Sequence, residues 1–158
     1  MIFKPGSIQG VTIKAMTKFS DKRGWLMEFF RTDEVDSKFF PAMAYISSTM
    51  PGLTRGPHEH RDQADFFCFP GPSTFRIYLW DGRKESPSYG SKMAFDVGQS
   101  SPTIIIVPPG VVHAYKNIGS VDGVVINLPN RLYAGTGRKE PVDEIRHEND
   151  PGSPYTID

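Results

Sequence analysis

The sequence contains little cysteine, no excess of either charge and no long apolar run. Cys68 is the only cysteine among 158 residues, which excludes an internal disulfide framework and suits a reducing compartment. The 18 Lys and Arg residues balance the 18 Asp and Glu residues, so no net basic field points to nucleic acid as a partner. No apolar run is long enough to cross a membrane, and no signal-peptide core is present. We therefore expect a cytoplasmic protein without a membrane or nucleic-acid partner.

Helical patterns are scarce, and the composition favours strands. Eleven Phe and six Tyr residues suit a pleated sheet, whereas 15 Gly and 14 Pro residues suit many short strands joined by turns. No repeat or linker divides the chain, so residues 1–158 are most simply one domain. The fold prediction is all-β, an antiparallel sandwich or barrel with little helix.

The predicted elements are apolar runs bounded by turn residues. We expect strands at residues 11–19 (a pair), 25–31, 42–50, 53–60, 66–69, 74–80, 93–97, 103–107, 112–117 and 124–128. Residues 32–40 are expected to form a short helix or loop, and residues 140–148 one short helix. In the run 74–80, the apolar residues Phe75, Ile77 and Leu79 alternate with Arg76, Tyr78 and Trp80. This alternation predicts a strand with two distinct faces.

Three of the four histidines lie in two short segments of the chain. His58, His60 and Asp65 share the first segment, and His113 follows the turn Pro108-Pro109-Gly110 in the second. Because side chains alternate along a strand, His58 and His60 share one face while the residue between them faces away. Such spacings allow a small β-barrel to direct imidazoles and a carboxylate into one pocket. The pocket could hold a metal, a catalytic base, or both at different times.

The two histidine segments resemble the two signature motifs of the cupin superfamily, whose members are small jelly-roll barrels. Asp65 stands where cupins usually carry Glu, and Pro102 stands where the second motif usually opens with Gly. The resemblance implies a cupin-type jelly-roll barrel of antiparallel strands.

Within the cupins, nearly the whole chain resembles the dTDP-4-dehydrorhamnose 3,5-epimerase family. The matching segments follow the family's order: Gly10-Val11, Asp21 to Glu28, Arg55-Gly-Pro-His58, Gln63, Ser86 to Gly90, Val107 to His113, Tyr133 and Asp150-Pro151. The resemblance implies an isomerase that abstracts a proton next to the keto group of a nucleotide-linked 4-keto-6-deoxy sugar. It also implies a role in surface polysaccharide or deoxysugar biosynthesis, a homodimer, and no required cofactor.

The resemblance further implies roles for individual residues. His58 would be the catalytic base, since a histidine titrates near the working pH, and Asp150 would orient it. Without the resemblance, Asp150 would be interpreted as the cap of a turn before Pro151. The implied substrate-binding residues are Arg23 and Glu28 for the nucleotide diphosphate and base, Arg55 and His113 for the sugar pocket, and also Gln63 and Tyr133.

Two positions depart from the family. Asn127 stands where the family has the tyrosine acid on the opposite face of the sugar, and an amide is no proton donor at neutral pH. Asp65 stands where the family has a lysine that stabilises the enolate. A carboxylate there would oppose the developing negative charge by several kcal/mol, an order-of-magnitude figure for a partly dry pocket. We therefore expect inversion at one carbon rather than at both.

These departures keep a metal site open as an alternative. His58, His60, Asp65 and His113 together form a donor set that suits Fe(II), Mn(II), Ni(II), Zn(II) or Co(II), and ligand identity does not choose among them. An imidazole nitrogen bound to a metal cannot also act as the base. Two further functions therefore stand beside the epimerase: a metal-dependent cupin enzyme acting on another small substrate, and a non-catalytic cupin that binds a sugar nucleotide.

Overall fold

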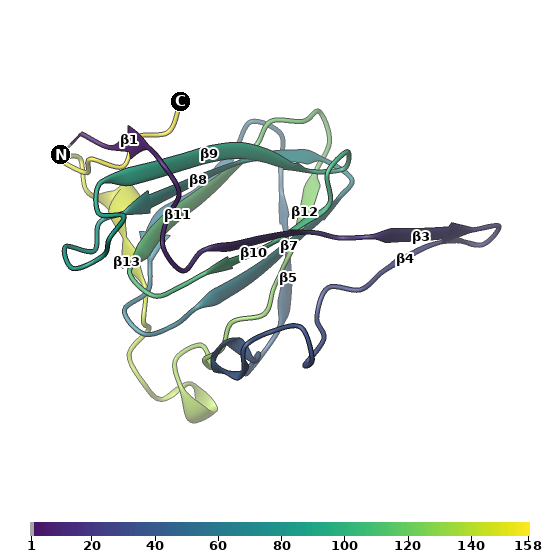
Figure 1. The fold of residues 1–158 in the computed structure, drawn as a ribbon, viewed down its shortest axis with the longest axis horizontal. Coiled ribbons are helices and arrows are strands. Elements are labelled where there is room, and N and C mark those ends of the chain that lie inside the picture. The colour runs from purple at the N-terminus through teal and green to yellow at the C-terminus, as the bar shows by residue number, and fades with distance from the viewer. Residues whose placement is uncertain (1) are drawn as a thin grey trace.

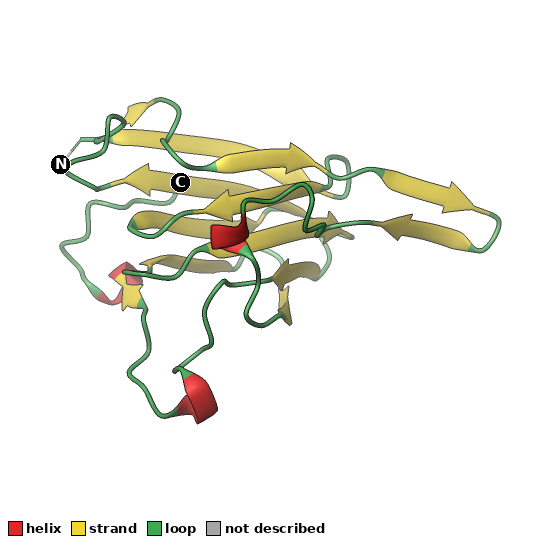
Figure 2. Cartoon of the chain, turned by 60° about the horizontal axis from the view of Figure 1, so that its bottom comes forward, coloured by secondary structure: helices red, strands yellow, loops and turns green. Residues whose placement is uncertain are grey.

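The computed structural model describes residues 2–158 and consists mainly of β-sheet (Figure 1, Figure 2). Its thirteen strands within these residues are β1 (Lys4–Pro5), β2 (Thr12–Ala15), β3 (Lys18–Asp21), β4 (Gly24–Met27), β5 (Tyr45–Thr49), β6 (Thr54–Glu59), β7 (Asp65–Gly71), β8 (Thr74–Asp81), β9 (Ser91–Gly98), β10 (Thr103–Val107), β11 (Val111–Asn117), β12 (Gly123–Asn127) and β13 (Ile145–Arg146). Three single-turn 3-10 helices accompany them: η1 (Ser37–Phe39), η2 (Thr136–Arg138) and η3 (His147–Asn149). No helix within residues 2–158 is both long enough and apolar enough to cross a membrane.

Two sheets form the barrel. The six-stranded sheet has the order β1-β9-β8-β11-β6-β13, and the five-stranded sheet has the order β2-β10-β7-β12-β5. Every pairing between these strands is antiparallel except that of β1 with β9. The predicted all-β jelly roll with little helix is confirmed.

The core lies between the two sheets because each sheet directs alternate side chains inward. On β8, Phe75, Ile77 and Leu79 join this core, as the alternation in the sequence predicted. Tyr78 and Trp80 point to the other face of the same strand, where the chain's C-terminal segment covers them. Both faces of β8 are therefore buried from Ile77 to Asp81.

A second apolar cluster covers the outer face of the five-stranded sheet. Cys68 lies in it, fully buried beside Phe66 and Ile104. Burial raises the pKa of the Cys68 thiol to about 12, so the thiol stays protonated and acts as a small apolar core residue.

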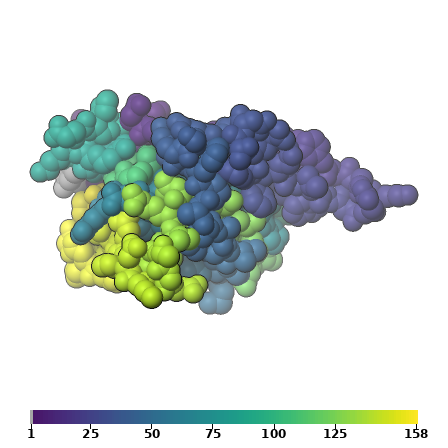
Figure 3. Space-filling view, turned by 90° about the horizontal axis from the view of Figure 1, so that it is seen from below, coloured from purple at the N-terminus to yellow at the C-terminus, as the bar shows by residue number. Residues whose placement is uncertain are grey.

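The hairpin of β3 and β4 stands away from the barrel (Figure 1, Figure 3). Within residues 2–158 these two strands pair only with each other. Phe19, Trp25 and Leu26 on the hairpin are more than half exposed, at 56%, 56% and 59%. Such large apolar side chains on a projecting element indicate a surface that another chain could cover.

One predicted strand is markedly shorter in the structure, and one predicted helix is replaced by a strand. The strand predicted at residues 25–31 ends at Met27, and the residues after it form a loop. The helix predicted at residues 140–148 is wrong, because β13 pairs there with β6 instead. The Asp143 carboxylate accepts the backbone N–H groups of residues 61–63, and these bonds tie the segment to the end of β6 in an extended conformation.

Candidate active site

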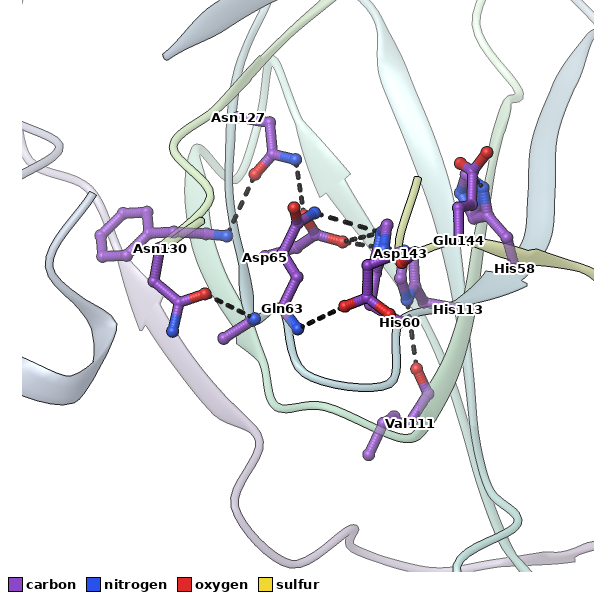
Figure 4. Close-up of polar contacts among 12 residues, drawn as sticks. His58, His60, Gln63, Asp65, Val111, His113, Asn127, Asn130, Asp143 and Glu144 are labelled. Carbon is purple, nitrogen blue, oxygen red and sulfur yellow. Dashed lines mark hydrogen bonds and ion pairs between the residues drawn. The ribbon is translucent and has the colours of Figure 1, made fainter. Parts of the chain in front are cut away.

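The predicted site residues His58, His113, Asp65 and Asn127 gather between the two sheets. His58 on β6 pairs directly with His113 on β11, and their ring centroids lie 4.8 Å apart. Asp65 begins β7 on the facing sheet, and Asn127 ends β12 beside it. The two histidine segments therefore meet, as their spacing predicted (Figure 4).

Gly56 permits the close approach of β6 to β11. Its φ of 87° lies in the left-handed region, and a Cβ there would lie 2.6 Å from the carbonyl oxygen of His113. Only glycine tolerates both conditions. This close approach accompanies a register shift between His113 and Tyr115, which locally alters the pairing of the strand that carries His113.

The expected alternation along β6 is confirmed. The rings of His58 and His60 lie 6.3 Å apart in the pocket. Glu59, between them, faces away, where its Oε1 lies 3.1 Å from His147 Nε2.

Asp65 is the centre of the polar cluster, with 2% of its surface exposed. Its Oδ2 lies 3.2 Å from the Nε2 atoms of both His60 and His113. Its Oδ1 accepts hydrogen bonds of 2.9 Å from Gln63 Nε2 and Asn127 Nδ2 (Figure 4). Burial alone would raise the pKa of Asp65, but the contacts with His113 and His60 outweigh it and hold the pKa well below the usual range. The carboxylate is therefore ionised.

Backbone carbonyls fix the orientation of two imidazoles. His113 Nδ1 lies 3.2 Å from the carbonyl oxygen of Val111, and His60 Nδ1 contacts that of Asp143. Because a carbonyl only accepts, each Nδ1 carries the hydrogen, and each Nε2 faces Asp65. Burial lowers the pKa of His60, but the hydrogen bond and charge of Asp65 outweigh it, so the pKa is raised overall.

His58 has a different partner. Its Nδ1 lies 3.0 Å from Glu144 Oε1, and Arg146 Nε donates to Glu144 Oε2 at 2.6 Å. Its Nε2 is buried and has no hydrogen-bond partner among the described residues. Burial, followed by the neighbouring imidazoles of His113 and His60, lowers the pKa of His58 to about 3. The ring is therefore neutral near pH 7, and Nε2 presents a lone pair to the pocket.

Among the described residues, Glu144 rather than Asp150 makes a hydrogen bond with the His58 ring. Asp150 Oδ1 accepts the backbone N–H of Gly152 at 2.9 Å, as the cap of a turn. The physical reason is the pairing of β13 with β6, in which Arg146 stands opposite His58. This register places Glu144 beside the imidazole. The sequence reasoning missed Glu144 because it assigned the segment to a helix.

Asn127 is fully occupied by hydrogen bonds. Its Oδ1 accepts the backbone N–H of Phe66 at 3.0 Å. Its Nδ2 donates to Asp65 Oδ1 at 2.9 Å and to the Tyr45 hydroxyl at 3.0 Å. Tyr45, on the edge strand β5, is a second pocket residue that the sequence reasoning missed.

The remaining predicted residues fall into three groups. Gln63 and His113 lie in the Asp65 cluster. Arg55 on β6 donates to Thr49 Oγ1 and to the Ser48 carbonyl. The others lie outside the cluster, on the hairpin or in loops: Arg23, which pairs with Asp21; Glu28, which lies 3.6 Å from Arg31; and Tyr133, which is 56% exposed.

The sequence profile of dTDP-4-dehydrorhamnose 3,5-epimerases matches residues 5–136 of this chain. The chain belongs to the dTDP-4-dehydrorhamnose 3,5-epimerase family. This membership confirms the predicted family and the predicted enzyme class, a sugar epimerase. Epimerases of this family act without a cofactor.

Relatives of the chain agree with the family assignment. The probable low-salt glycan biosynthesis epimerase Agl13 of Haloferax volcanii is 36% identical over 129 residues, which cover 80% of this chain and 81% of that protein. The spore coat polysaccharide biosynthesis protein SpsL of Bacillus subtilis is 31% identical over 126 residues, covering 80% and 82%. A crystal structure of a dTDP sugar isomerase from Desulfovibrio desulfuricans has a TM-score of 0.78 at 19% identity, covering 94% of this chain and 91% of that chain, and thus shares the fold.

Proposed function

We propose that this epimerase inverts one carbon next to the keto group of a nucleotide-diphosphate-linked 4-keto-6-deoxy sugar, with His58 as the base. The observation that carries the proposal is the state of the His58 ring. Its Nδ1 is held by Glu144, and its Nε2 is buried in the pocket without a partner. A neutral imidazole in this orientation is prepared to accept a proton at Nε2.

The substrate class and pathway follow from the relatives. Both curated relatives are named for the biosynthesis of a glycan or coat polysaccharide, so we assign this chain to surface polysaccharide or deoxysugar biosynthesis. The single buried Cys68 suits work in the cytoplasm, which this proposal includes. Arg55 and His113 would line the sugar pocket.

Inversion at one carbon follows from the residue at position 127. An amide with all its polar atoms engaged cannot act as the tyrosine acid of the family, so the family's mechanism of inversion at both carbons lacks its acid here, and we propose that inversion is limited to one carbon. Incubation with dTDP-4-keto-6-deoxyglucose in heavy water, followed by NMR, tests this. Deuterium at C3 alone or C5 alone supports the proposal. Deuterium at both carbons would contradict the one-carbon part, and deuterium at neither would contradict the substrate.

The proposal includes a homodimer in which the β3–β4 hairpin of one chain reaches the pocket of the other. Arg23 and Glu28 would bind the nucleotide, yet within one chain they lie on or next to an element that stands away from the barrel (Figure 3). The exposed side chains of Phe19, Trp25 and Leu26 would be buried against the second copy. Light scattering of the purified protein would give twice the chain mass of 17.7 kDa.

A metal-assisted variant of this function is the second candidate, favoured by the geometry around Asp65. His60, Asp65 and His113 each offer one ligand atom, and these atoms lie within 4.8 Å of one another. In both imidazoles, Nδ1 is hydrogen-bonded to a backbone carbonyl and Nε2 would be the ligand atom. Metal-ligating histidines usually have this arrangement. His58 is not part of this group of ligand atoms, so three of the four ligands proposed from the sequence would hold the metal. The His58 imidazole would then be free to act as the base.

The residues therefore fit a divalent transition metal, and an ion held by them would supply positive charge next to the substrate's keto oxygen. Elemental analysis of protein purified without a polyhistidine tag tests this candidate. We expect about one metal per chain in the native protein, and its loss in the Asp65→Asn variant. A metal content far below one per chain, together with a melting temperature that chelator does not change, would exclude it.

A further inference from the structure

Inversion at a carbon requires groups on both faces of the substrate. One group removes a proton from one face, and another delivers a proton to the opposite face. This further inference rests on the proposed function, in which His58 removes the proton. Because His58 lies on β6 of the six-stranded sheet, the donor should come from the facing five-stranded sheet.

Tyr45 lies on that facing wall. In the pairing of β5 with β12 it stands directly opposite Asn127, so the two side chains share the inward face. Nearly half of Tyr45 is exposed along the edge strand, at 46%, whereas its hydroxyl reaches the buried Asn127. The Tyr45 side chain therefore extends from the surface to the buried Asn127.

A chain of hydrogen bonds positions the Tyr45 hydroxyl. Asn127 Nδ2 donates to the hydroxyl oxygen at 3.0 Å and to Asp65 Oδ1 at 2.9 Å. Because the hydroxyl accepts in this bond, its own hydrogen is not used by Asn127. Among residues 2–158 the structure gives no acceptor for that hydrogen. The hydroxyl is thus oriented but still has a proton to give.

The surroundings keep the phenol protonated. Burial raises the pKa of Tyr45, and the carboxylates of Asp65 and Glu144 act in the same direction, against the opposing bond from Asn127. A phenol held in its neutral form near pH 7 can donate a proton.

Two other tyrosines near the pocket suit the role less well. Tyr115 lies on β11, in the same sheet as His58, and packs in the apolar core with 6% exposure. Tyr133 lies in the loop after β12 and is 56% exposed. Neither places a phenol on the inward face of the sheet opposite His58.

We propose that Tyr45 is the proton donor that completes inversion, in place of the tyrosine absent at position 127. His58 Nε2 takes the proton from the carbon next to the keto group, which leaves an enolate and an imidazolium. The enolate carbon then takes the Tyr45 hydroxyl proton on its opposite face, and the phenol becomes a phenolate. Return of the proton from His58 to Tyr45 through solvent restores both groups, so charge and protons balance.

Tyr45→Phe separates the two proton transfers. In heavy water, we expect the variant to form inverted product at least about 10²-fold more slowly than the native protein does. We also expect it to exchange deuterium into recovered, uninverted substrate at close to the native rate, because His58 is intact. Tyr89→Phe is the matched control, since Tyr89 is equally exposed at 46% but lies in the loop between β8 and β9. It should invert the substrate at the native rate.

Three outcomes would overturn the inference. Native inversion by Tyr45→Phe would show that another group donates the proton. Loss of both exchange and inversion in a folded variant would assign Tyr45 to binding or positioning instead. Absence of exchange in the native protein would refute the proposed function itself. If Tyr45→Phe does not fold, a fluorinated tyrosine at position 45 keeps the shape and lowers the phenol pKa, and an unchanged inversion rate there would equally refute the donor role.

Discussion

His58 Nδ1 lies 3.0 Å from Glu144 Oε1, which joins the strand of the base to a carboxylate 86 residues further along the chain. A carboxylate beside Nδ1 favours the tautomer that carries its hydrogen on Nδ1, which leaves Nε2 free to accept a proton. The carboxylate also stabilises the imidazolium formed on proton abstraction. Glu144 is thus a positioning residue for the base.

Glu144→Gln should slow deuterium exchange into the substrate by roughly 10-fold to 100-fold, because a neutral amide stabilises the imidazolium less than a carboxylate does. The Michaelis constant and the melting temperature should change little. The matched control is Glu148→Gln, at an exposed position four residues away. Asp150→Asn should also exchange at nearly the native rate. The reverse pattern, with Asp150→Asn slow and Glu144→Gln native, would restore the role that the family resemblance implied for Asp150.

The sequence predicted the elements whose signals are local. Strand β8 was recognised from the alternation of Phe75, Ile77 and Leu79, and β10 from a continuous apolar run at Thr103–Val107. The meeting of His58 with His113 followed from motif spacing, because both motifs occur within predicted strands.

The sequence did not predict two contacts that depend on the pairing of edge strands. Glu144 reaches His58 only because β13 adds to the edge of β6, and Tyr45 reaches Asn127 only because β5 pairs with β12 in a particular register. These partners are 86 and 82 residues apart. No periodicity within either segment specifies which strand it joins.

Asn127→Leu should destabilise the fold by about 2 to 4 kcal/mol. The side chain is 1% exposed, and its removal leaves the buried N–H of Phe66 and one bond of Asp65 unsatisfied. Urea unfolding followed by tryptophan fluorescence measures the change. Ser120→Ala, at an exposed loop position, serves as the control and should change stability by less than about 0.5 kcal/mol. An equally stable Asn127→Leu variant would show that these bonds contribute nothing net.

Asp81 predicts how stability depends on pH. Its side chain is fully buried and accepts bonds from Arg83, Ser86 and Ser88. Burial alone would raise the pKa of Asp81, but these bonds outweigh it and hold the pKa well below the usual range. Because the unfolded chain then binds a proton at a higher pH than the folded one, the stabilisation is present above the ordinary Asp pKa and is lost as pH falls below it.

Asp81→Asn should therefore reduce the free energy of unfolding near pH 7. It should also flatten the decline of this free energy below about pH 4, where the ordinary carboxyl pKa of about 3.9 lies. Urea unfolding at several pH values between about 3 and 7 measures both effects. Asp122→Asn, at an exposed position, should leave the profile unchanged. An Asp81→Asn profile parallel to the native one would assign the acid sensitivity to other groups.

The hairpin proposal predicts complementation between two inactive variants. If the β3–β4 hairpin serves the pocket of the partner, a mixed dimer of Arg23→Ala and His58→Asn chains contains one site with both native residues. Refolding an equal mixture should then restore about one quarter of the native activity, because about half of the dimers are mixed and each has one complete site of two. If the hairpin serves its own chain, both sites of the mixed dimer lack one residue, and the mixture stays as inactive as its components. Lys22→Ala, beside Arg23 at the exposed tip of the hairpin, is the control. It should be active by itself, without mixing with a second variant.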